Sequence, residues 1–446
     1  MVGNKSHNLF AKMKLDEFLP TIQTHVGKIK KKGFALTVDV SGKKINSKTI
    51  RLLYFLLNNY EDTYFITIKG LPYCLMSDAS EHLVYRKDKG KKYYHDQICK
   101  KCHLINNCPG WQKSFSIDRM KVSPVKSRPK EIVVEITTDC NLACRTCSLY
   151  RRKTLNTGIK EVKAIIKQLK PLGIKAIRFT GGEPFLNKAI GEMLKTAKEN
   201  NLYSLVNTNA TVLNDSILKL LKKNADNILI SLQGFNQKTD NFLTNSNQDF
   251  NRKLANIIKL KAKVPIVRIG TVISRTLINN FDSYSKLIRK LGIDNWELYR
   301  PIIKGQSEEF DISKKDLLNI MRKLYKLKTK GMKVKIANPV PFCISKNMDL
   351  SLATLLGAIA DDGHSRIVWD TKGYFKPSYF INKNLGKTIK GAWNNAFLQK
   401  INSLDYLPVK CKKCEYLKWC QGGNRAITKK LKDNYFLPDP LMPLSK

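Results

Sequence analysis

The sequence predicts an α/β protein in which an open, partial (β/α)6 barrel of parallel strands is flanked by small cysteine-rich α+β domains on its N- and C-terminal sides. Two observations point to this fold class. From residue 131 onward, six short apolar stretches alternate with helical stretches, as in the strand–helix–strand units of a parallel sheet. The eleven cysteines fall into groups of four, three and four along the chain. Six strands are too few to close an eight-stranded barrel, so we expect an open one.

Changes in this pattern divide the chain into four parts. Residues 1–113 are predicted to form an N-terminal domain, and residues 114–130, which contain prolines and several basic residues, a linker. The barrel is predicted over residues 131–338 and a C-terminal domain over residues 339–446.

The N-terminal domain contains two predicted strands, a predicted helix and four cysteines. Residues 34–40 alternate like a strand, residues 47–60 have the apolar spacing of an amphipathic helix, and residues 64–68 are a second predicted strand. The cysteines of this domain are Cys74, Cys99, Cys102 and Cys108.

The barrel is predicted from six strand–helix units. Its strands span residues 132–136, 176–179, 203–207, 227–232, 266–273 and 295–299. Its helices span residues 160–169, 189–200, 215–223, 252–260 and 281–291, and a further helix and strand span residues 314–327 and 333–337. Ligands of such sheets bind at the carboxyl ends of the strands, so we expect the functional site in the loops that follow them.

The C-terminal domain begins with a hairpin and ends with closely spaced cysteines. Residues 366–380 predict a hairpin that turns at Lys372-Gly373, and residues 389–401 predict a short helix. The cysteines of this domain are Cys343, Cys411, Cys414 and Cys420.

The composition is that of a globular protein with an unusual charge. Hydrophobic residues make up 42% of the 446 residues, and 80 Lys plus Arg against 36 Asp plus Glu give a net charge of +44. Such a charge favours a polyanionic partner such as RNA or the ribosome, although a generally solvated basic surface is the alternative. We find no transmembrane segment and no signal peptide, so we expect a cytoplasmic protein.

Three cysteines follow the first predicted barrel strand, in the order Cys140-Asn-Leu-Ala-Cys144-Arg-Thr-Cys147. Three thiolates at this spacing can ligate three irons of a [4Fe–4S] cluster and leave the fourth iron open for chemistry. The alternative is a structural zinc site.

The second predicted strand ends in Phe179-Thr-Gly-Gly-Glu-Pro184. Two adjacent glycines allow the backbone to approach a ligand closely. Glu183 beside them supplies an acceptor for a cationic amine.

Together, the two motifs resemble the radical S-adenosylmethionine (SAM) superfamily, over roughly residues 131–337. The resemblance implies that Cys140, Cys144 and Cys147 hold a catalytic [4Fe–4S] cluster whose open iron chelates SAM. Reductive cleavage of SAM would then give a 5′-deoxyadenosyl radical that abstracts hydrogen from a substrate, with ferredoxin or flavodoxin as a typical electron donor.

The resemblance also implies which residues contact SAM. The positions that match the family's SAM contacts are Gly181, Gly182, Glu183, Pro184, Asn209 and Ser231. Three positions depart from the pattern. Thr146 stands where the family's loop often has an aromatic residue, Ala210 where a glycine is common, and Gln233 where many relatives have Asp.

The C-terminal cysteines resemble the SPASM/twitch extension of peptide- and protein-modifying radical SAM enzymes. The resemblance rests on Cys411-x2-Cys414-x5-Cys420 and the following Gln-Gly-Gly. Ser378 and Asn424 occupy two positions where a full SPASM domain has cysteines, so one auxiliary [4Fe–4S] cluster is implied, held by the four remaining thiols.

The N-terminal cysteines repeat the same spacing, Cys99-x2-Cys102-x5-Cys108. Each triplet also follows a lone cysteine in a similar setting, Leu-Pro-Tyr-Cys74 and Val-Pro-Phe-Cys343. This repeat suggests a second auxiliary cluster and three clusters in all. A four-cysteine zinc site is the alternative at either place.

The extension favours a peptide or protein side chain as the substrate, with oxidative maturation or cross-linking as the outcome. Radical modification of RNA or a lipid is the alternative that the charge suggests. A second alternative, from a different functional class, is a noncatalytic Fe–S or zinc protein that binds nucleic acid. This hypothesis would leave the Gly-Gly-Glu-Pro turn without a role.

Overall fold

The computed structural model describes residues 14–84, 93–105, 108–112, 122–147, 153–247, 250–302, 307–355 and 363–443. The chain divides into two compact units, Met1–Ser127 and Arg128–Lys446. The division between them lies within the predicted linker, of which residues 114–121 are outside the described part. The boundary predicted after residue 338 remains a prediction.

The first unit is a four-stranded sheet packed against two helices. Its strands, in the order in which they pair, are β1 (Lys28–Lys32), β2 (Ala35–Asp39), β3 (Phe65–Lys69) and β4 (Leu83–Val84). Helices α1 (Leu15–Val26) and α2 (Ser47–Tyr60) meet through the buried ring of Phe18, whose centroid lies 4.8 Å from that of Phe55. The predicted helix and both predicted strands are present, whereas α1 and β1 were not expected.

The second unit contains an open nine-stranded sheet. Seven of its strands are parallel and lie side by side in the order in which they occur along the chain. These parallel strands are β7 (Glu131–Thr137), β8 (Ala176–Gly181), β9 (Tyr203–Thr208), β10 (Asn227–Ser231), β11 (Ile266–Val272), β12 (Asn295–Tyr299) and β13 (Val334–Ile336). All predicted barrel strands are therefore present, and the parallel α/β fold is confirmed.

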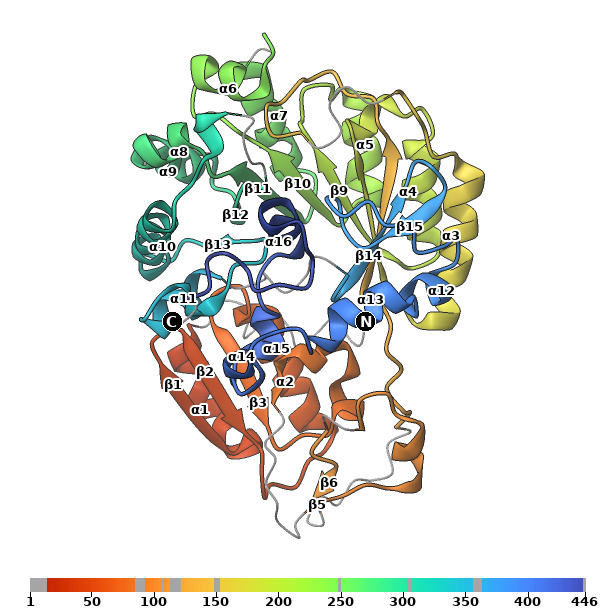
Figure 1. Cartoon of the computed structure of the whole chain (residues 1–446), viewed down its shortest axis with the longest axis vertical. Helices are drawn as coiled ribbons and strands as arrows, with labels where there is room; N and C mark the ends of the chain where they lie inside the picture. Colours follow the sequence, from red (N-terminus) through yellow and green to blue (C-terminus); the bar gives the residue numbers. More distant parts are fainter. Residues whose placement is uncertain are drawn as a thin grey trace. The chain divides into compact units, whose positions relative to one another are not determined.

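Helices follow the strands along the outer side of the sheet (Figure 1). They are α3 (Ile159–Leu172), α4 (Ile190–Glu199), α5 (Asp215–Asn224), α6 (Gln237–Thr244), α7 (Phe250–Lys261), α8 (Arg275–Asn279), α9 (Phe281–Leu291) and α10 (Lys314–Thr329). Side chains alternate across each strand. On β12, for example, Trp296 packs against Phe281 of α9, with ring centroids 5.5 Å apart, whereas Glu297 and Tyr299 line a cavity on the inner side.

The C-terminal hairpin belongs to the same sheet as the barrel. Strands β14 (Arg366–Asp370) and β15 (Tyr374–Lys376) pair antiparallel, as predicted, and β14 also pairs parallel with β7. The ammonium group of Lys376, which is fully buried, lies 2.9 Å from each carboxylate oxygen of Glu135 on β7 and 3.2 Å from Asp370. A sheet pairing and a buried ion cluster therefore join this hairpin to the first barrel strand.

The remaining C-terminal segment consists of short helices. They are α11 (Met348–Thr354), α12 (Ile389–Trp393), α13 (Ala396–Ser403), α14 (Val409–Lys412), α15 (Leu417–Cys420) and α16 (Arg425–Lys432). The single helix predicted over residues 389–401 is thus two helices, because the chain leaves helical geometry at Asn394 and Asn395.

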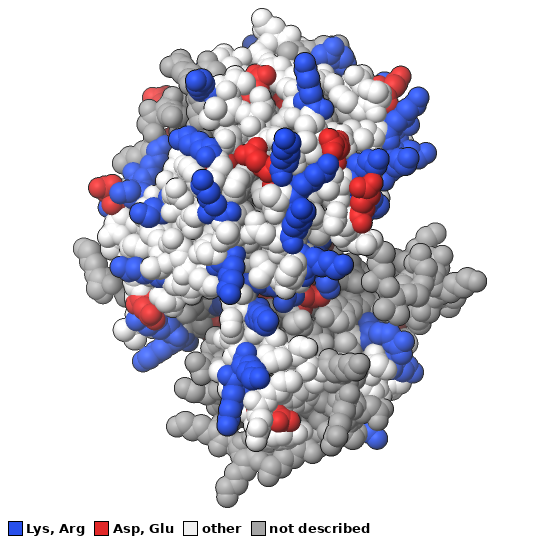
Figure 2. All heavy atoms as spheres, turned by 90° about the vertical axis from the view of Figure 1, so that its right-hand side faces the viewer, with Lys and Arg blue, Asp and Glu red and all other residues white. Residues whose placement is uncertain are grey.

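Basic side chains are dispersed over one face of the molecule. On the face shown in Figure 2, lysines and arginines lie scattered among acidic and neutral residues, without one continuous patch. Within the described part of the chain, none of the helices has both the length and the apolar character needed to cross a bilayer.

We expect Lys376→Met to lower the free energy of unfolding by about 3–5 kcal/mol, because it leaves the buried carboxylates of Glu135 and Asp370 without their shared cation. Lys372→Met in the exposed hairpin turn is the matched control and should change the stability by less than about 0.5 kcal/mol. Urea unfolding of the full chain measures both. Equal stability of the two variants would show that the Lys376 cluster does not join the hairpin to the barrel.

Candidate active site

The loop that carries the cysteine triplet is held by the end of α6. It follows β7, and within it the backbone N–H groups of Ala143 and Arg145 donate to the carbonyl oxygens of Thr244 and Leu243, at 3.2 and 3.1 Å. The last carbonyls of a helix have no partner within the helix. The loop therefore provides donors that satisfy these carbonyls, and α6 fixes the path of the loop.

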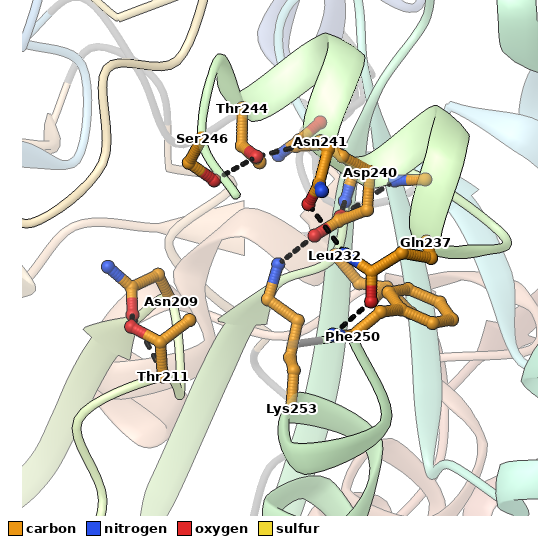
Figure 3. A network of polar contacts seen from close by, with 12 residues as sticks. Asn209, Thr211, Leu232, Gln237, Asp240, Asn241, Thr244, Ser246, Phe250 and Lys253 are labelled. Carbon is orange, nitrogen blue, oxygen red and sulfur yellow. Dashed lines mark hydrogen bonds and ion pairs between the residues drawn. The ribbon is translucent and has the colours of Figure 1, made fainter. Parts of the chain in front are cut away.

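A buried ion pair positions α6. The Nζ atom of Lys253 on α7 lies 2.8 Å from Oδ2 of Asp240 on α6, and only 1% and 2% of these side chains are exposed. The other carboxylate oxygen of Asp240 accepts N–H groups of Gln233 and Gly234, and its backbone carbonyl accepts the Thr244 hydroxyl at 2.7 Å. Figure 3 shows this network, in which one carboxylate joins α6, α7 and the loop after β10.

The Gly-Gly-Glu-Pro turn after β8 packs directly on the start of the cysteine loop. The N–H of Gly182 donates to the Thr137 carbonyl at 2.7 Å, and the N–H of Glu183 donates to the Asp139 carbonyl at 2.8 Å. A Cβ atom on Gly181 would overlap the Thr137 carbonyl oxygen, and one on Gly182 would overlap the Asp139 carbonyl oxygen. The two glycines are thus required by contact between two loops of the protein.

Glu183 is fully buried, and protein groups hydrogen bond to its carboxylate. It accepts the Thr208 hydroxyl at 2.7 Å, the Asn209 N–H at 2.8 Å and the Phe185 N–H at 3.3 Å. Burial raises the pKa of Glu183 to about 7, although these hydrogen bonds act in the opposite direction. The carboxyl group therefore ties the turn after β8 to the end of β9.

Asn209 extends this connection back to the cysteine loop. Its Nδ2 donates to Oδ1 of Asn141 at 2.9 Å and lies 3.9 Å from the sulfur of Cys140. Its Oδ1 accepts both the N–H and the hydroxyl of Thr211. The side chain predicted to contact SAM is therefore also held against the first cysteine.

Ala210, next to Asn209, adopts a left-handed conformation with φ of 60°. This is the backbone conformation that favours glycine, which agrees with the residue type expected there. The Ala210 carbonyl accepts the Nδ2 of Asn256 on α7, at 2.9 Å.

One cavity of about 430 Å³ lies inside the open barrel. Of the predicted site residues, Cys147, Gly181 and Ser231 line it, together with Gln233 and Gly270. The other residues predicted for the triplet and for SAM are not part of this lining: Cys140, Cys144, Gly182, Glu183, Pro184 and Asn209. The Gln233 amide oxygen accepts the Val272 N–H at 3.0 Å, so this side chain bridges β10 and β11.

Burial raises the pKa of two thiols of the triplet above the usual value of a cysteine. Burial raises the pKa of Cys144 to about 12 and that of Cys140 to about 11, and the neighbouring Cys147 contributes to both shifts. Binding of iron would therefore release protons. The donor set fits a cluster, because the three sulfurs share one short loop and lie within electrostatic reach of one another.

The four N-terminal cysteines line one small cavity with apolar walls. Cys74, Cys99, Cys102 and Cys108 all face it, together with Ile98, Ile105, Trp111 and Val122. Burial raises the pKa of Cys74 to about 12, and the other three thiols add to this shift. Four residues separated by up to 34 positions are thus brought to one site, as the repeat of their spacing suggests.

The four C-terminal cysteines are also neighbours. Burial raises the pKa of Cys420 to about 12, with contributions from Cys343 and Cys414, and the pKa of Cys343 is raised by burial and by Cys411. The positions without cysteine have other roles, since the buried Ser378 accepts the Phe380 N–H at 3.3 Å and Asn424 caps α16 through the Ile427 N–H at 2.8 Å.

Across the described residues, no three His, Cys, Asp or Glu side chains converge as closely as the ligands of a single metal ion. Ligands of a single metal ion must all lie close to that ion. The thiolates of a four-iron cluster lie further apart, since each binds a different iron.

Sequence reasoning missed the residues that support the triplet. Asn141, Asp240 and Lys253 do so through contacts between segments far apart in the chain. No local motif marks them, although a lysine on the apolar face of an amphipathic helix, as at 253, is an available signal.

Gly182→Ala should displace the cysteine loop, because its methyl group would meet the Asp139 carbonyl. We expect a loss of about 1–3 kcal/mol in the free energy of unfolding and reduced iron content after reconstitution. Gly191→Ala on α4 is the control, since its Cβ would lie 3.5 Å from Leu220, an ordinary contact, and its stability should be unchanged or slightly higher. Urea unfolding and iron analysis test both, and full iron occupancy in Gly182→Ala would contradict the packing argument.

Comparison with known proteins agrees with this geometry. The chain is 24% identical over 320 residues to an AdoMet-dependent heme synthase of Methanosarcina barkeri, covering 66% of this chain and 90% of the relative. It is 26% identical over 300 residues to a GTP 3',8-cyclase of Clostridium botulinum, covering 61% and 88%.

Solved structures show the same fold. Streptococcus suis SuiB bound to S-adenosylmethionine superposes with a TM-score of 0.60 at 19% identity, over 71% of this chain and 78% of that one. Native anSMEcpe with bound AdoMet superposes with a TM-score of 0.55 at 19% identity, over 69% and 93%.

The family model described as the Radical SAM superfamily matches residues 134–282, which include the cysteine loop, the Gly-Gly-Glu-Pro turn and the ends of β9 to β11. This family implies a [4Fe–4S] cluster and SAM as cofactors. Residues 134–282 are therefore similar to the Radical SAM superfamily, and the chain is an enzyme.

Proposed function

We propose that this enzyme cleaves SAM reductively and uses the resulting 5′-deoxyadenosyl radical to abstract hydrogen from a peptide or protein side chain. The observation that carries the proposal is the direct contact between the cysteine loop and the Gly-Gly-Glu-Pro turn, above a cavity of about 430 Å³. In this reading Cys140, Cys144 and Cys147 hold the cluster that supplies the electron to SAM.

The chain's own residues then position the cofactor. The turn at Gly181 and Gly182 presents backbone groups beside the triplet, and Ser231 presents a hydroxyl from β10 to the same cavity as Cys147. The carboxylate of Glu183 acts indirectly, because its hydrogen bonds hold Asn209 against the loop.

The peptide substrate is supported by the neighbours in fold. SuiB is described in complex with its precursor peptide SuiA, and anSMEcpe in complex with the Kp18Cys peptide. The cavity of this chain is open on one side of the sheet, and polar and charged side chains form much of its lining. These features suit a hydrophilic segment of peptide.

We further propose that the two four-cysteine sets hold auxiliary [4Fe–4S] clusters, which gives three clusters. The support is the enclosed cavity that Cys74, Cys99, Cys102 and Cys108 share, and the matching spacing around Cys420. Four protein thiolates leave no open iron, so electron transfer or structural support is the role that fits. Reduced ferredoxin or flavodoxin would supply the electrons.

The first test is formation of 5′-deoxyadenosine from SAM by the anaerobically reconstituted, reduced enzyme, followed by mass spectrometry. We expect product from the wild type and from the control Lys259→Met, an exposed position on α7, and none from Cys144→Ser. Absence of product from a wild type that contains the full complement of iron would refute the proposal.

The second test counts iron and zinc in the purified, reconstituted chain. The wild type should contain about twelve irons, since each cluster has four. Replacing Cys99 and Cys102 by serine should remove about four irons and leave the other sites occupied. Zinc that disappears with this replacement, together with about eight irons in the wild type, would assign the N-terminal set to zinc.

A further inference from the structure

Charged residues form a layer on the inner side of the barrel sheet, below the level of the cysteine loop. On β7 and β8, the carboxylate of Glu131 binds the Arg178 guanidinium through two hydrogen bonds of 2.6 and 3.0 Å. On β11 and β12, Arg268 Nη1 binds Glu297 at 2.7 Å. All four side chains line the same cavity as Cys147.

The two arginines differ in how completely their donors are used. For Arg178, Nε and Nη2 bind Glu131, and Nη1 binds Asn207 at 3.2 Å. For Arg268, Nε binds Asn227 at 2.8 Å and Nη1 binds Glu297. Its Nη2 is buried and has no partner among the residues that the structure describes. A buried charged donor without an acceptor is costly, which favours an acceptor supplied by a ligand.

The space beside Arg268 leads toward the proposed site of SAM. Arg268, Gly270 and Val272 alternate along β11 and face the cavity in turn. A Cβ atom at Gly270 would lie 3.1 Å from the Tyr299 ring and 3.3 Å from Leu229, so a larger residue would narrow the passage here. The glycine leaves the space between Arg268 and the carboxyl end of the barrel free of a side chain at this position.

We propose that Arg268 binds a carboxylate of the substrate, such as an aspartate or glutamate side chain of a peptide, at the inner end of this cavity. The proposal rests on the proposed function, because it assumes that the substrate enters the barrel beneath the triplet. The carboxylate would accept an N–H of Nη2, and the part of the substrate nearer the cysteine loop would face the radical.

The lining of the cavity favours an anionic ligand group. Cations outnumber acids in it, since the lining contains three carboxylates, Glu131, Glu135 and Glu297, and five basic side chains, Arg178, Arg268, Arg300, Lys335 and Arg366. Although burial opposes ionisation, the charges of Arg268 and Lys335 lower the pKa of Glu297 to about 2, so this carboxylate is ionised at neutral pH. Arg268 therefore adds a positive donor within a region that already contains acids.

The test uses two small probes that differ only in charge, N-acetylglutamate amide and N-acetylglutamine amide. Their affinities for the reconstituted, oxidised full chain are measured by ligand-observed NMR in the presence of SAM. We expect at least tenfold tighter binding of the acidic probe by the wild type and by Arg289→Gln, an exposed position on α9. Arg268→Gln should lose at least tenfold in affinity for the acidic probe and little for the amide probe.

Because Arg268→Gln leaves Glu297 without its closest cation, the double variant Arg268→Gln/Glu297→Gln keeps the test decisive if the single variant does not fold. Circular dichroism and thermal unfolding identify folded variants. Equal binding of the two probes by the wild type, or retention of acidic-probe binding by a folded Arg268 variant, would overturn the proposal.

Formation of 5′-deoxyadenosine by the wild type and Arg289→Gln is measured on the same preparations. Charge-selective binding without this product would refute the proposed radical chemistry and leave the carboxylate site standing. Formation of the product without charge-selective binding would support the proposed radical chemistry and refute the carboxylate site.

Discussion

The active site depends on the contact between two backbone segments, the start of the cysteine loop and the turn after β8. Two N–H···O hydrogen bonds, of 2.7 and 2.8 Å, join them, and each contributes about 1 kcal/mol. Glycine is needed at both 181 and 182, since a side chain at 181 would overlap the carbonyl of Thr137 at the end of β7 and one at 182 would overlap the carbonyl of Asp139 in the cysteine loop. The triplet, the turn and the end of β9 are consequently held as one unit, in which Glu183 and Asn209 are the connecting side chains.

The inner side of the barrel sheet differs from its outer side in the polarity of its side chains. Apolar residues of the strands face the helices, whereas the inner side carries ion pairs such as Glu131–Arg178 and Arg268–Glu297. Buried ion pairs contribute little net stability, because removing the charges from water offsets most of their attraction. An interior built in this way is open and polar, and it suits a hydrophilic ligand better than a packed apolar core would.

Local patterns predicted most elements but few of the contacts between them. The helices over 47–60 and 281–291 agree in both bounds, because their apolar spacing and flanking residues act within a few positions. Strand β1, Lys-Ile-Lys-Lys-Lys, was not predicted, since exposed lysines on an edge strand carry no apolar alternation. The motifs located the triplet and the turn, but the ion pair of Asp240 and Lys253 joins residues on two helices that sequence spacing cannot pair. The structure adds a packing role for the two glycines, which allow a neighbouring backbone segment to approach, and their contact with a ligand stays a prediction.

The position of β14 has a consequence for synthesis of the chain. The first barrel strand is flanked by β8 on one side and by β14 on the other, and Lys376, which neutralises Glu135, lies 241 residues further along the chain. During translation, β7 therefore leaves the ribosome long before its second neighbour exists. One edge of β7 therefore stays unpaired, and the carboxylate of Glu135 stays without Lys376, until most of the protein has been made. Contacts of such long range form late and slowly, so the barrel is completed only when the C-terminal hairpin docks.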